Sequence, residues 1–386
     1  MDTKELDKTY VAGTYKRFPV EIVSGKGSVV KDPSGKEYID MGSGIGVTSF
    51  GIADEIWQKA VTEQISKVQH MSNLYYTRPC VELAKLLCEK TGMSKVFFSN
   101  SGAEANECAI KVARKWAAEN KGPACSTIVT LKNSFHGRTL TTLAATGQDH
   151  FHELFQPLTP GFASFAVGDM DALKALCANG TVAAVLIELV QGEGGVIPLD
   201  PSFVKELDAY LKEQNILLMI DEVQTGNGRT GSLYAYMQYG LKPDVVSTAK
   251  GLAGGLPMGA TLMSEKVKDV LSYGDHGSTF GGNPVAAAAA LSIVERLTDD
   301  FLADVTRKSN LIRSLLEDAP GIESVSGLGL MLGLKTVKPA GEVVAACMAN
   351  GVLCLTAKDK VRLLPALNIP DELLIKAAEI IKQACA

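Results

Sequence analysis

The sequence predicts an α/β fold: a large domain with a mostly parallel sheet covered by helices, joined to a smaller α+β domain made from both termini. Three observations lead to this prediction. In the middle of the chain, short apolar runs alternate with segments of helical spacing, as in parallel strands buried on both faces. After about Asn283 the pattern changes to Ala-rich helices and short strands. A chain of 386 residues is long enough for one large and one smaller domain.

The large domain is expected over residues 46–281. Its strands are apolar runs rich in β-forming residues, at 94–100, 126–131, 182–189, 216–223, 244–249 and 259–264. A helix is predicted at 102–120, where Ala109, Val112 and Trp116 share one face. A second helix, from about Pro201 to Gln214, separates two of the strands.

The smaller domain is expected over residues 1–45 and 282–386. Its C-terminal part contains segments of helical spacing and several short strand-like runs. Helices are expected at 283–297, 301–319, 342–350 and 371–386, and strands at 325–335, 352–356 and 361–367. Near the N-terminus, KGSVVKDPSGKEYIDMGSG predicts a hairpin with its turn at DPSG.

The composition narrows the classes of partner. The formal net charge of -5 gives no support for nucleic acid or an anionic membrane as a partner. No apolar run is long enough to span a bilayer, and the polar start MDTKELDKTY lacks the apolar region of a signal peptide, so a cytoplasmic protein is expected. The eight cysteines form no CxxC pair and predict reduced thiols, and the five histidines form no HExxH-like pair, so no metal site is expected.

Charged residues stand where three of the predicted strands end. Asp221 follows LLMI, Lys250 follows DVVSTA, and Glu188 ends VAAVLIE. In open α/β sheets, ligands bind beyond the carboxyl ends of the strands, so we expect these side chains to face one crevice. An isolated Asp221 would more simply cap a helix or pair with an arginine. That alternative weakens when a lysine and a glutamate end neighbouring strands in the same way.

A buried lysine predicts a particular chemistry. Desolvation removes the charge of its amine, which can then form a Schiff base with an aldehyde. Pyridoxal phosphate is the common cellular aldehyde held in this way, and its ring nitrogen needs a carboxylate such as Asp221. Its phosphate needs backbone N–H groups at a helix start, which Ser101, Gly102 and Ala103 of SNSGAEANE could supply. Taken alone, SNSGAE is more simply interpreted as an ordinary helix cap.

Two loops carry further residues that could bind the cofactor or a substrate. In NSFHGRTL, Phe135 could stack on a cofactor ring and Arg138 could hold a carboxylate, or the two could be a packed aromatic and a solvated cation. His136 lies between them. In HGSTFGGNP, Thr279 could bind phosphate, or the segment could be a flexible connector.

Seven blocks of the sequence together resemble the class III (subgroup II) aminotransferases, which are pyridoxal-phosphate enzymes of fold type I. The blocks are SNSGAEANE, SFHGRTL, IELVQGEGGV, IDEVQTGNGRTG, STAKGLAGGLPMGA, HGSTFGGNP and RLLPAL. Each block is weak alone, but the seven occur in family order between about residues 40 and 370. The resemblance implies that Lys250 binds the cofactor and acts in catalysis with Asp221, in a homodimer whose sites lie at the interface.

Carried over position by position, the resemblance implies two sets of residues. The cofactor-binding set is Ser101, Gly102, Ala103, Phe135, Asp221, Val223, Gln224, Lys250 and Thr279, the last from the neighbouring subunit. The substrate-binding set is Arg138, Glu193, Ser278 and Arg362. In it, the two arginines hold substrate carboxylates and Glu193 faces Arg362.

Within the family, the loops at 43–51 and 70–79 resemble those of the acetylornithine enzymes. Ornithine enzymes tend to carry a tyrosine where this chain has SGIG, and that tyrosine helps to recognise a free α-amino group. We therefore expect transfer of the δ-amino group of N-acetylornithine to 2-oxoglutarate, a step of arginine biosynthesis. The alternatives are ornithine, succinylornithine, succinyldiaminopimelate or 4-aminobutyrate as donor, an aminomutase of the same fold, and an inactive homologue that only binds ligands.

Overall fold

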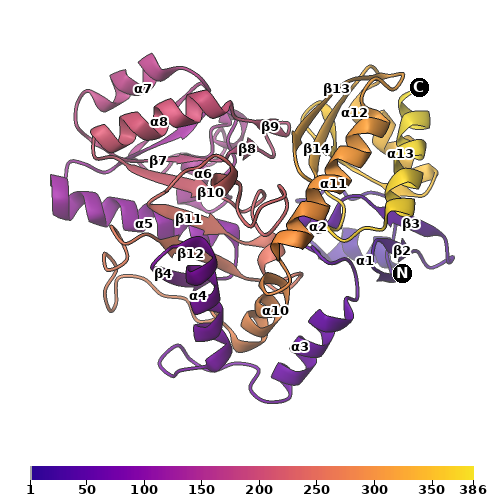
Figure 1. Ribbon diagram of the computed structural model, residues 1–386, viewed down its shortest axis with the longest axis horizontal. Coiled ribbons are helices and arrows are strands. Elements are labelled where there is room, and N and C mark those ends of the chain that lie inside the picture. The colour runs from indigo at the N-terminus through magenta and orange to yellow at the C-terminus, as the bar shows by residue number, and fades with distance from the viewer. Residues whose placement is uncertain (1) are drawn as a thin grey trace.

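The computed structural model describes residues 2–386, and its centre is a sheet of seven strands (Figure 1). In spatial order these strands are β4 (Lys95–Ser99), β12 (Gly259–Met263), β11 (Val245–Thr248), β10 (Leu217–Asp221), β7 (Val182–Ile187), β5 (Thr127–Leu131) and β6 (Phe162–Phe165). All neighbouring pairs are parallel except the two made by β12, which is antiparallel to β11 and β4. The prediction of a mostly parallel sheet is confirmed. Strand β6 was not predicted, because FASF is short and lies at the edge of the sheet, where burial is incomplete.

Helices cover both faces of this sheet, and the alternation of side chains along each strand explains how. Leu217 and Met219 of β10 belong to an apolar cluster with helix α5 (Gly102–Lys121). Leu218 and Ile220 belong to the other cluster, with α4 (Arg78–Thr91), α7 (Met170–Cys177) and α8 (Pro201–Glu213). Because both faces are covered, the strands read as continuous apolar runs rather than as alternating ones.

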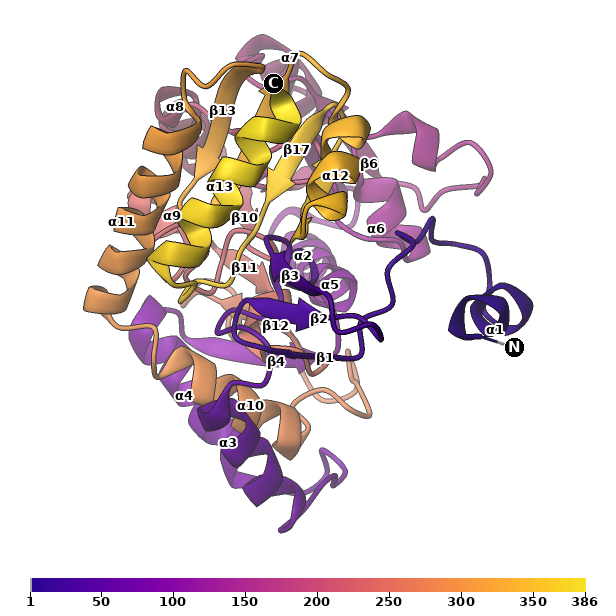
Figure 2. The same ribbon diagram turned by 90° about the vertical axis from the view of Figure 1, so that its right-hand side faces the viewer.

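Segments from the N-terminal and C-terminal parts of the chain lie together beside the large sheet, although the two termini themselves are far apart (Figure 2). The predicted N-terminal hairpin is present as β2 (Val29–Lys31) and β3 (Glu37–Asp40), and β3 pairs in parallel with β15 (Val352–Leu353). A second sheet has the order β13 (Ile322–Leu328), β14 (Met331–Thr336), β17 (Lys360–Leu363) and β16 (Leu355–Ala357). The helices beside it are α11 (Asp299–Leu316), α12 (Ala340–Ala349) and α13 (Asp371–Cys385). Helix α10 (Pro284–Val294) packs instead on α3 (Glu55–Ile65) and α4. The division into domains at residues 46 and 281 stays a prediction.

The remaining elements are short. They are α1 (Thr3–Tyr10), β1 (Ser24–Lys26), α2 (Ser43–Gly46), α6 (Leu140–Ala145), the 3-10 turn η1 (Asp149–Phe151), β8 (Val190–Gln191), β9 (Ile197–Pro198), α9 (Ala235–Gln238) and the 3-10 turn η2 (Lys250–Leu252). Helix α1 stands away from the body of the chain in Figure 2, and none of its residues is buried.

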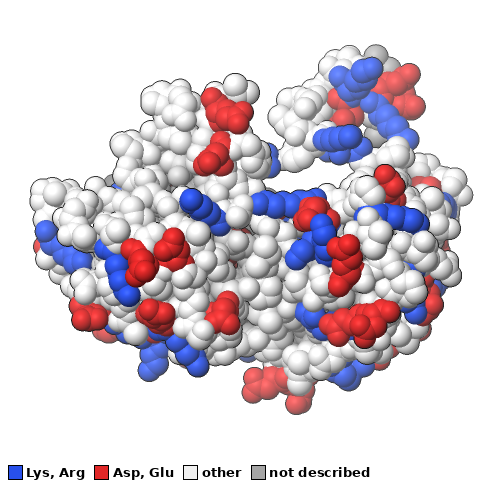
Figure 3. Space-filling model, turned by 90° about the horizontal axis from the view of Figure 1, so that it is seen from above, with Lys and Arg blue, Asp and Glu red and all other residues white. Residues whose placement is uncertain are grey.

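The face of the molecule seen in Figure 3 shows no dominant charge. On this face, cationic and anionic side chains are interspersed. Within residues 2–386, no helix is both long enough and apolar enough to cross a membrane. All eight cysteines are free thiols, and five of them are buried.

Candidate functional site

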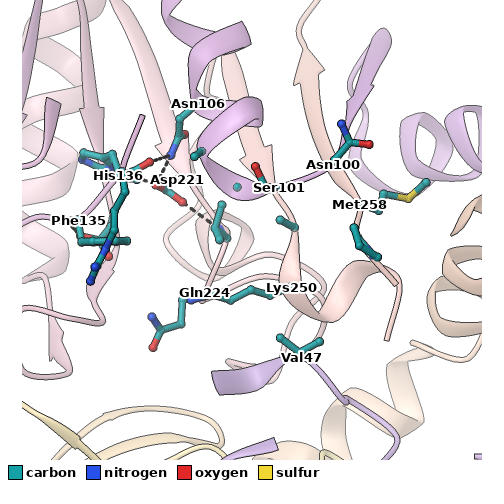
Figure 4. Close-up of a pocket in the computed structure, with 18 of the residues that line it drawn as sticks. Val47, Asn100, Ser101, Asn106, Phe135, His136, Asp221, Gln224, Lys250 and Met258 are labelled. Atoms are coloured by element: carbon teal, nitrogen blue, oxygen red, sulfur yellow. Dashed lines mark hydrogen bonds and ion pairs between the residues drawn. The ribbon is translucent and has the colours of Figure 1, made fainter. Parts of the chain in front are cut away.

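Three charged side chains come together where adjacent parallel strands end. Glu188 directly follows β7, Asp221 is the last residue of β10, and Lys250 comes two residues after β11. Since β11, β10 and β7 are neighbours in the sheet, their carboxyl ends lie at one edge. All three side chains line a cavity of ≈ 420 Å³ (Figure 4).

The structure brings most of the predicted site residues to this cavity. Nine line it: Ser101, Gly102, Ala103, Phe135, Arg138, Asp221, Val223, Gln224 and Lys250. Glu193 and Arg362 lie next to it, because Arg362 Nη1 donates a hydrogen bond of 3.2 Å to Oε1 of the lining residue Gln224. Ser278 and Thr279 do not line it, although Ser278 Oγ accepts a hydrogen bond of 3.1 Å from Nδ2 of the lining residue Asn100.

Asp221 is held at the bottom of the cavity by a hydrogen-bond network (Figure 4). Its Oδ2 accepts from Asn106 Nδ2 and lies against His136 Nδ1, both at 2.8 Å, and its Oδ1 accepts from Val223 N at 3.0 Å. Asn106 is fixed in turn by Ser247, whose hydroxyl donates to Asn106 Oδ1 at 2.5 Å. A carboxylate has about four lone-pair positions, so one remains open on Oδ1. Asp221 is therefore oriented before any ligand arrives.

Three members of this network were missed as site residues by the sequence reasoning: Asn106, His136 and Ser247. For Asn106 a signal existed, because it lies three residues before Ala109 on the apolar face of helix 102–120. A polar residue on a buried helix face requires a hydrogen-bond partner. Nothing in the sequence identified that partner as Asp221.

Lys250 has an unusual backbone and a suppressed charge. Its φ is +45°, a region that non-glycine residues adopt rarely and mostly at functional sites. Burial lowers the pKa of its amine, an effect that the nearby charge of Glu193 partly opposes. A lowered pKa increases the fraction of neutral, nucleophilic amine.

Glu188 lines the same cavity and has a raised pKa. Burial raises the pKa of its carboxyl to about 7, and the charge of Asp221 adds to the shift. The N–H groups of Phe135 and Gly192 donate to it, at 2.9 and 3.2 Å. Glu188 thus ties the loop that carries Phe135 to the loop that carries Glu193.

The start of helix α5 presents backbone N–H groups that are suited to binding an anion. Ser101 caps the helix, and its hydroxyl accepts from Glu104 N at 3.2 Å. The N–H groups of Gly102 and Ala103 belong to the first turn, where no helix carbonyl can pair with them, and they line the cavity. A Cβ on Gly102 would lie 2.7 Å from Val223 Cγ1, so only glycine allows this close approach.

Aromatic and cationic side chains form one wall. Phe135 lines the cavity, and the guanidinium carbon of Arg138 lies 5.7 Å from the centre of its ring and 5.2 Å from that of Phe151. Arg138 is exposed, so its guanidinium remains accessible to a ligand. Val223, two residues after Asp221, also lines the cavity.

The rim of the site is an ion pair between two distant parts of the chain. Arg362 on β17 donates from Nη1 to Glu193 Oε1 at 2.5 Å. The Arg362 side chain is 4% exposed and that of Glu193 is 32% exposed. Burial works to raise the pKa of Glu193, but the charge and hydrogen bond of Arg362 outweigh it, and the pKa is lowered. Arg362 Nε is buried without a partner in the described chain, which leaves a donor available.

Ser278 and Thr279 line a different cavity of ≈ 410 Å³, with His70, Asn73 and Leu74. Asn73 Nδ2 holds this loop by donating to the carbonyls of Ser278 and Gly281, both at 2.9 Å. Thr279 is exposed. Within one chain the loop meets the edge of the Lys250 cavity through the hydrogen bond from Asn100 to Ser278, but Thr279 does not line that cavity.

The residues present fit pyridoxal phosphate. The cavity combines a lysine, a helix start with free N–H groups, an oriented carboxylate with an open lone pair, and an aromatic side chain. The glycine at position 102 shows that these groups crowd around a compact space. Among residues 2–386 no group of three metal-ligating side chains occurs.

Comparison with known proteins places this geometry in context. The family described as "Aminotransferase class-III" matches residues 10–385. The acetylornithine aminotransferase of Haemophilus ducreyi is 50% identical over 382 residues, which are 98% of this chain and 97% of that protein.

Solved structures agree over almost the whole chain. The N-acetylornithine aminotransferase from Stenotrophomonas maltophilia K279a has a TM-score of 0.85 and 35% identity, and the match covers 98% of this chain and 97% of that one. The ornithine aminotransferase from Toxoplasma gondii ME49 has a TM-score of 0.94 and 31% identity, covering 100% of this chain and 95% of that one. The backbone alone therefore does not separate the two kinds of amino donor.

Proposed function

This chain belongs to the class-III aminotransferases, and we propose that it transfers the δ-amino group of N-acetylornithine to 2-oxoglutarate, forming N-acetylglutamate 5-semialdehyde and glutamate. The observation that carries the choice of donor is the 50% identity to an acetylornithine aminotransferase over 98% of the chain. The cofactor is pyridoxal 5'-phosphate.

When bound, pyridoxal phosphate supplies an aldehyde that takes up amino groups and a ring that accepts electron density. The chain supplies position and proton transfer. With the cofactor bound, Asp221 would hold a proton on the ring nitrogen and Gln224 would bond the ring hydroxyl. Phe135 and Val223 would enclose the ring, and the start of α5 would bind the phosphate. Lys250 Nζ takes a proton from the amine-bearing carbon of the donor and returns one to the acceptor.

Two arginines serve two unlike substrates. Glutamate and 2-oxoglutarate carry two carboxylates, whereas N-acetylornithine carries one, far from its reacting amine. Arg138 holds that distant carboxylate, and Arg362 binds the α-carboxylate of glutamate. With N-acetylornithine bound, Arg362 would be a buried, unpaired charge, which is costly. The 2.5 Å pair with Glu193 supports the proposal that Glu193 neutralises it.

The turn formed by α2 (Ser43–Gly46) supports an acylated donor. All four of its residues have positive φ, so it is a left-handed turn, and it packs against the segment of Lys250. Val47 lines the cavity next to it. The turn reads SGIG and carries no tyrosine hydroxyl that could accept a free α-amino group.

The decisive experiment is a panel of amino donors with 2-oxoglutarate as acceptor. N-acetylornithine should give the highest kcat/KM, ahead of ornithine, succinylornithine and 4-aminobutyrate. A higher value for any other donor contradicts the proposed substrate. An aminomutase would turn over without 2-oxoglutarate, and an inactive homologue would lack the visible absorption band of the lysine-bound cofactor.

We also propose a homodimer in which the loop with Ser278 and Thr279 completes the partner's site. This loop is held by Asn73 and carries the exposed Phe280, and the exposed Leu74 lines the same cavity as Ser278 and Thr279. Thr279 would add a donor to the partner's phosphate. On dilution below the dimer's dissociation constant, cofactor should then dissociate. A monomer with full cofactor occupancy and activity contradicts the dimer.

A further inference from the structure

The loop that carries Glu193 is rich in glycine but is closely packed against its neighbours. The hairpin of β8 and β9 pairs Val190 with Pro198 and Gln191 with Ile197, and GEGGV connects them. A Cβ on Gly194 would lie 2.7 Å from the carbonyl oxygen of Asn133. The glycines therefore permit close packing of the loop rather than free space around it, and any movement of the Glu193 carboxylate depends on how firmly this hairpin is held.

Val196, the last residue of the loop, is strained and completely buried. Its φ is +53°, and its side chain is 0% exposed. A β-branched residue in this region costs about 1–3 kcal/mol and persists only where its surroundings enforce it. It belongs to a small apolar cluster with Val190, Met331 and Leu364, which joins the hairpin to the sheet that carries Arg362.

A hydrogen-bonded connection enforces this conformation. Ser326 on β13 donates from its hydroxyl to the carbonyl oxygen of Val196 at 2.8 Å. The same hydroxyl accepts from Lys360 Nζ at 2.8 Å. Lys360 lies on β17, two residues before Arg362. The chain of bonds from Val196 through Ser326 to Lys360 thus links the loop that carries Glu193 to the strand that carries Arg362. Figure 1 shows β8 and β9 facing β13 and β14 at this place.

Gly333 forms the surface of β14 on which Val196 packs. It lies on β14 directly opposite Arg362 in the strand register. A Cβ on Gly333 would lie 2.8 Å from Val196 Cβ and 3.2 Å from Lys360 Cδ. The bare backbone at position 333 therefore lets Val196 rest on the sheet next to Arg362.

We propose that Ser326, Lys360 and Gly333 form a strut that fixes the Glu193 hairpin against β17, and that they are positioning residues for the choice between the two amino donors. The inference rests on the proposed function, because it concerns the alternation of Arg362 between Glu193 and a substrate carboxylate. With the strut intact, only the Glu193 side chain has to move. Without it, the hairpin drifts, the pairing weakens, and Arg362 is more often free for glutamate.

The test compares Ser326→Ala with Ser324→Ala, which changes an exposed serine on the same strand. Loss of one hydrogen bond, about 1 kcal/mol, should lower the ratio of single-turnover rates for N-acetylornithine and glutamate about fivefold. Ser326→Thr keeps the hydroxyl and should restore the ratio. In a Glu193→Ala background, Ser326→Ala should have no further effect on the ratio, whereas a general structural defect would act in both backgrounds.

Hydrogen exchange of the holoenzyme gives a second readout that is independent of turnover. The backbone amides of residues 190–197 should exchange faster in Ser326→Ala than in Ser324→Ala. Equal exchange, or a ratio within about twofold of the control, overturns the strut. If the wild type reacts with neither donor, the proposed function and the donor role of the strut both fail, while exchange still shows whether Ser326 holds the hairpin.

Discussion

The bottom of the site, which is the hydrogen-bond network around Asp221, and its rim, which is the pair of Arg362 and Glu193, are built in different ways. At the bottom, Asp221 receives three hydrogen bonds of 2.8–3.0 Å from groups attached to one sheet and its covering helix. At the rim, Arg362 and Glu193 come from segments 169 residues apart, and one buried guanidinium nitrogen has no partner in the described chain. The bottom keeps one open lone pair on Asp221 and one unpaired nitrogen, His136 Nε2, but both side chains are buried, whereas the rim has one partner that is a third exposed.

This difference separates chemistry from selection. A group that takes part in every turnover is best held in one position, because misplacement costs rate with every substrate. A group that must face two unlike substrates needs two positions of similar free energy. Changes at the bottom should therefore reduce all reactions alike, and changes at the rim should alter their ratio.

The largest effect is expected at Lys250. Lys250→Ala removes the amine that binds the cofactor and transfers the proton, so turnover with every donor should fall to background, together with the visible absorption of the bound cofactor. Lys242→Ala, an exposed lysine on the preceding connection, is the control and should leave both unchanged. Borohydride reduction that fixes the cofactor to another lysine would show that the assignment is wrong.

The next effect is expected at Asp221. Asp221→Asn leaves the ring nitrogen largely unprotonated, and a key electrostatic group is worth roughly 3–4 kcal/mol, so kcat should fall by a factor of roughly 10²–10³ or more. The loss should be the same for N-acetylornithine and glutamate. Asp171→Asn, on the exposed side of α7, is a matched control. A loss confined to one donor would break the distinction between bottom and rim.

A smaller and selective effect is expected at Glu193. Glu193→Ala frees Arg362 permanently, and a hydrogen bond between charged groups is worth about 1.5–3 kcal/mol, so the rate ratio should shift towards glutamate by roughly tenfold or more. The measurement is cofactor absorbance in single turnover with each donor. Glu213→Ala, an exposed glutamate at the end of α8, is the control. An unchanged ratio would exclude the exchange of partners at Arg362 and leave the aminotransferase activity intact.

The smallest effect on turnover is expected at Glu222, the neighbour of Asp221 that does not line the cavity. Burial raises the pKa of its carboxyl from 4.5 to about 7. Below pH 4.5 both the folded and the unfolded chain hold this proton, and between 4.5 and 7 only the folded chain keeps it. Its contribution to stability is therefore fully present at low pH and is lost as pH rises through 7.

Glu222→Gln stays uncharged at every pH. Its amide can still accept from Tyr236 N, and the Thr225 hydroxyl can reverse to accept from it. The melting temperature of the variant should therefore rise relative to the wild type between pH 5 and pH 8, by the equivalent of roughly 1–3 kcal/mol, with kcat unchanged. Exposed Glu323→Gln is the control. A parallel pH profile for variant and wild type would mean that Glu222 is not buried as a neutral acid.

Much of the fold could be predicted from the sequence. The continuous apolar runs identified six of the seven strands of the large sheet, because burial on both faces imposes a pattern that is visible locally. Asp221, Lys250 and Glu188 stood out for the same reason: a charge directly after such a run has to lie at the end of a strand. The turn residues DPSG likewise predicted the hairpin of β2 and β3.

Tertiary structure decided what depends on the meeting of distant segments. The antiparallel direction of β12, the contact of Asn106 with Asp221, and the seat of Val196 on Gly333 leave no periodic trace in the sequence. Hydrophobic periodicity reports which face of a segment is buried, but hydrogen-bond partners and close approaches depend on the packing of whole elements. The sequence by itself therefore determined the layers of the sheet and the charges at the ends of its strands. Only the folded chain decided which polar groups orient those charges and which backbone holds the rim.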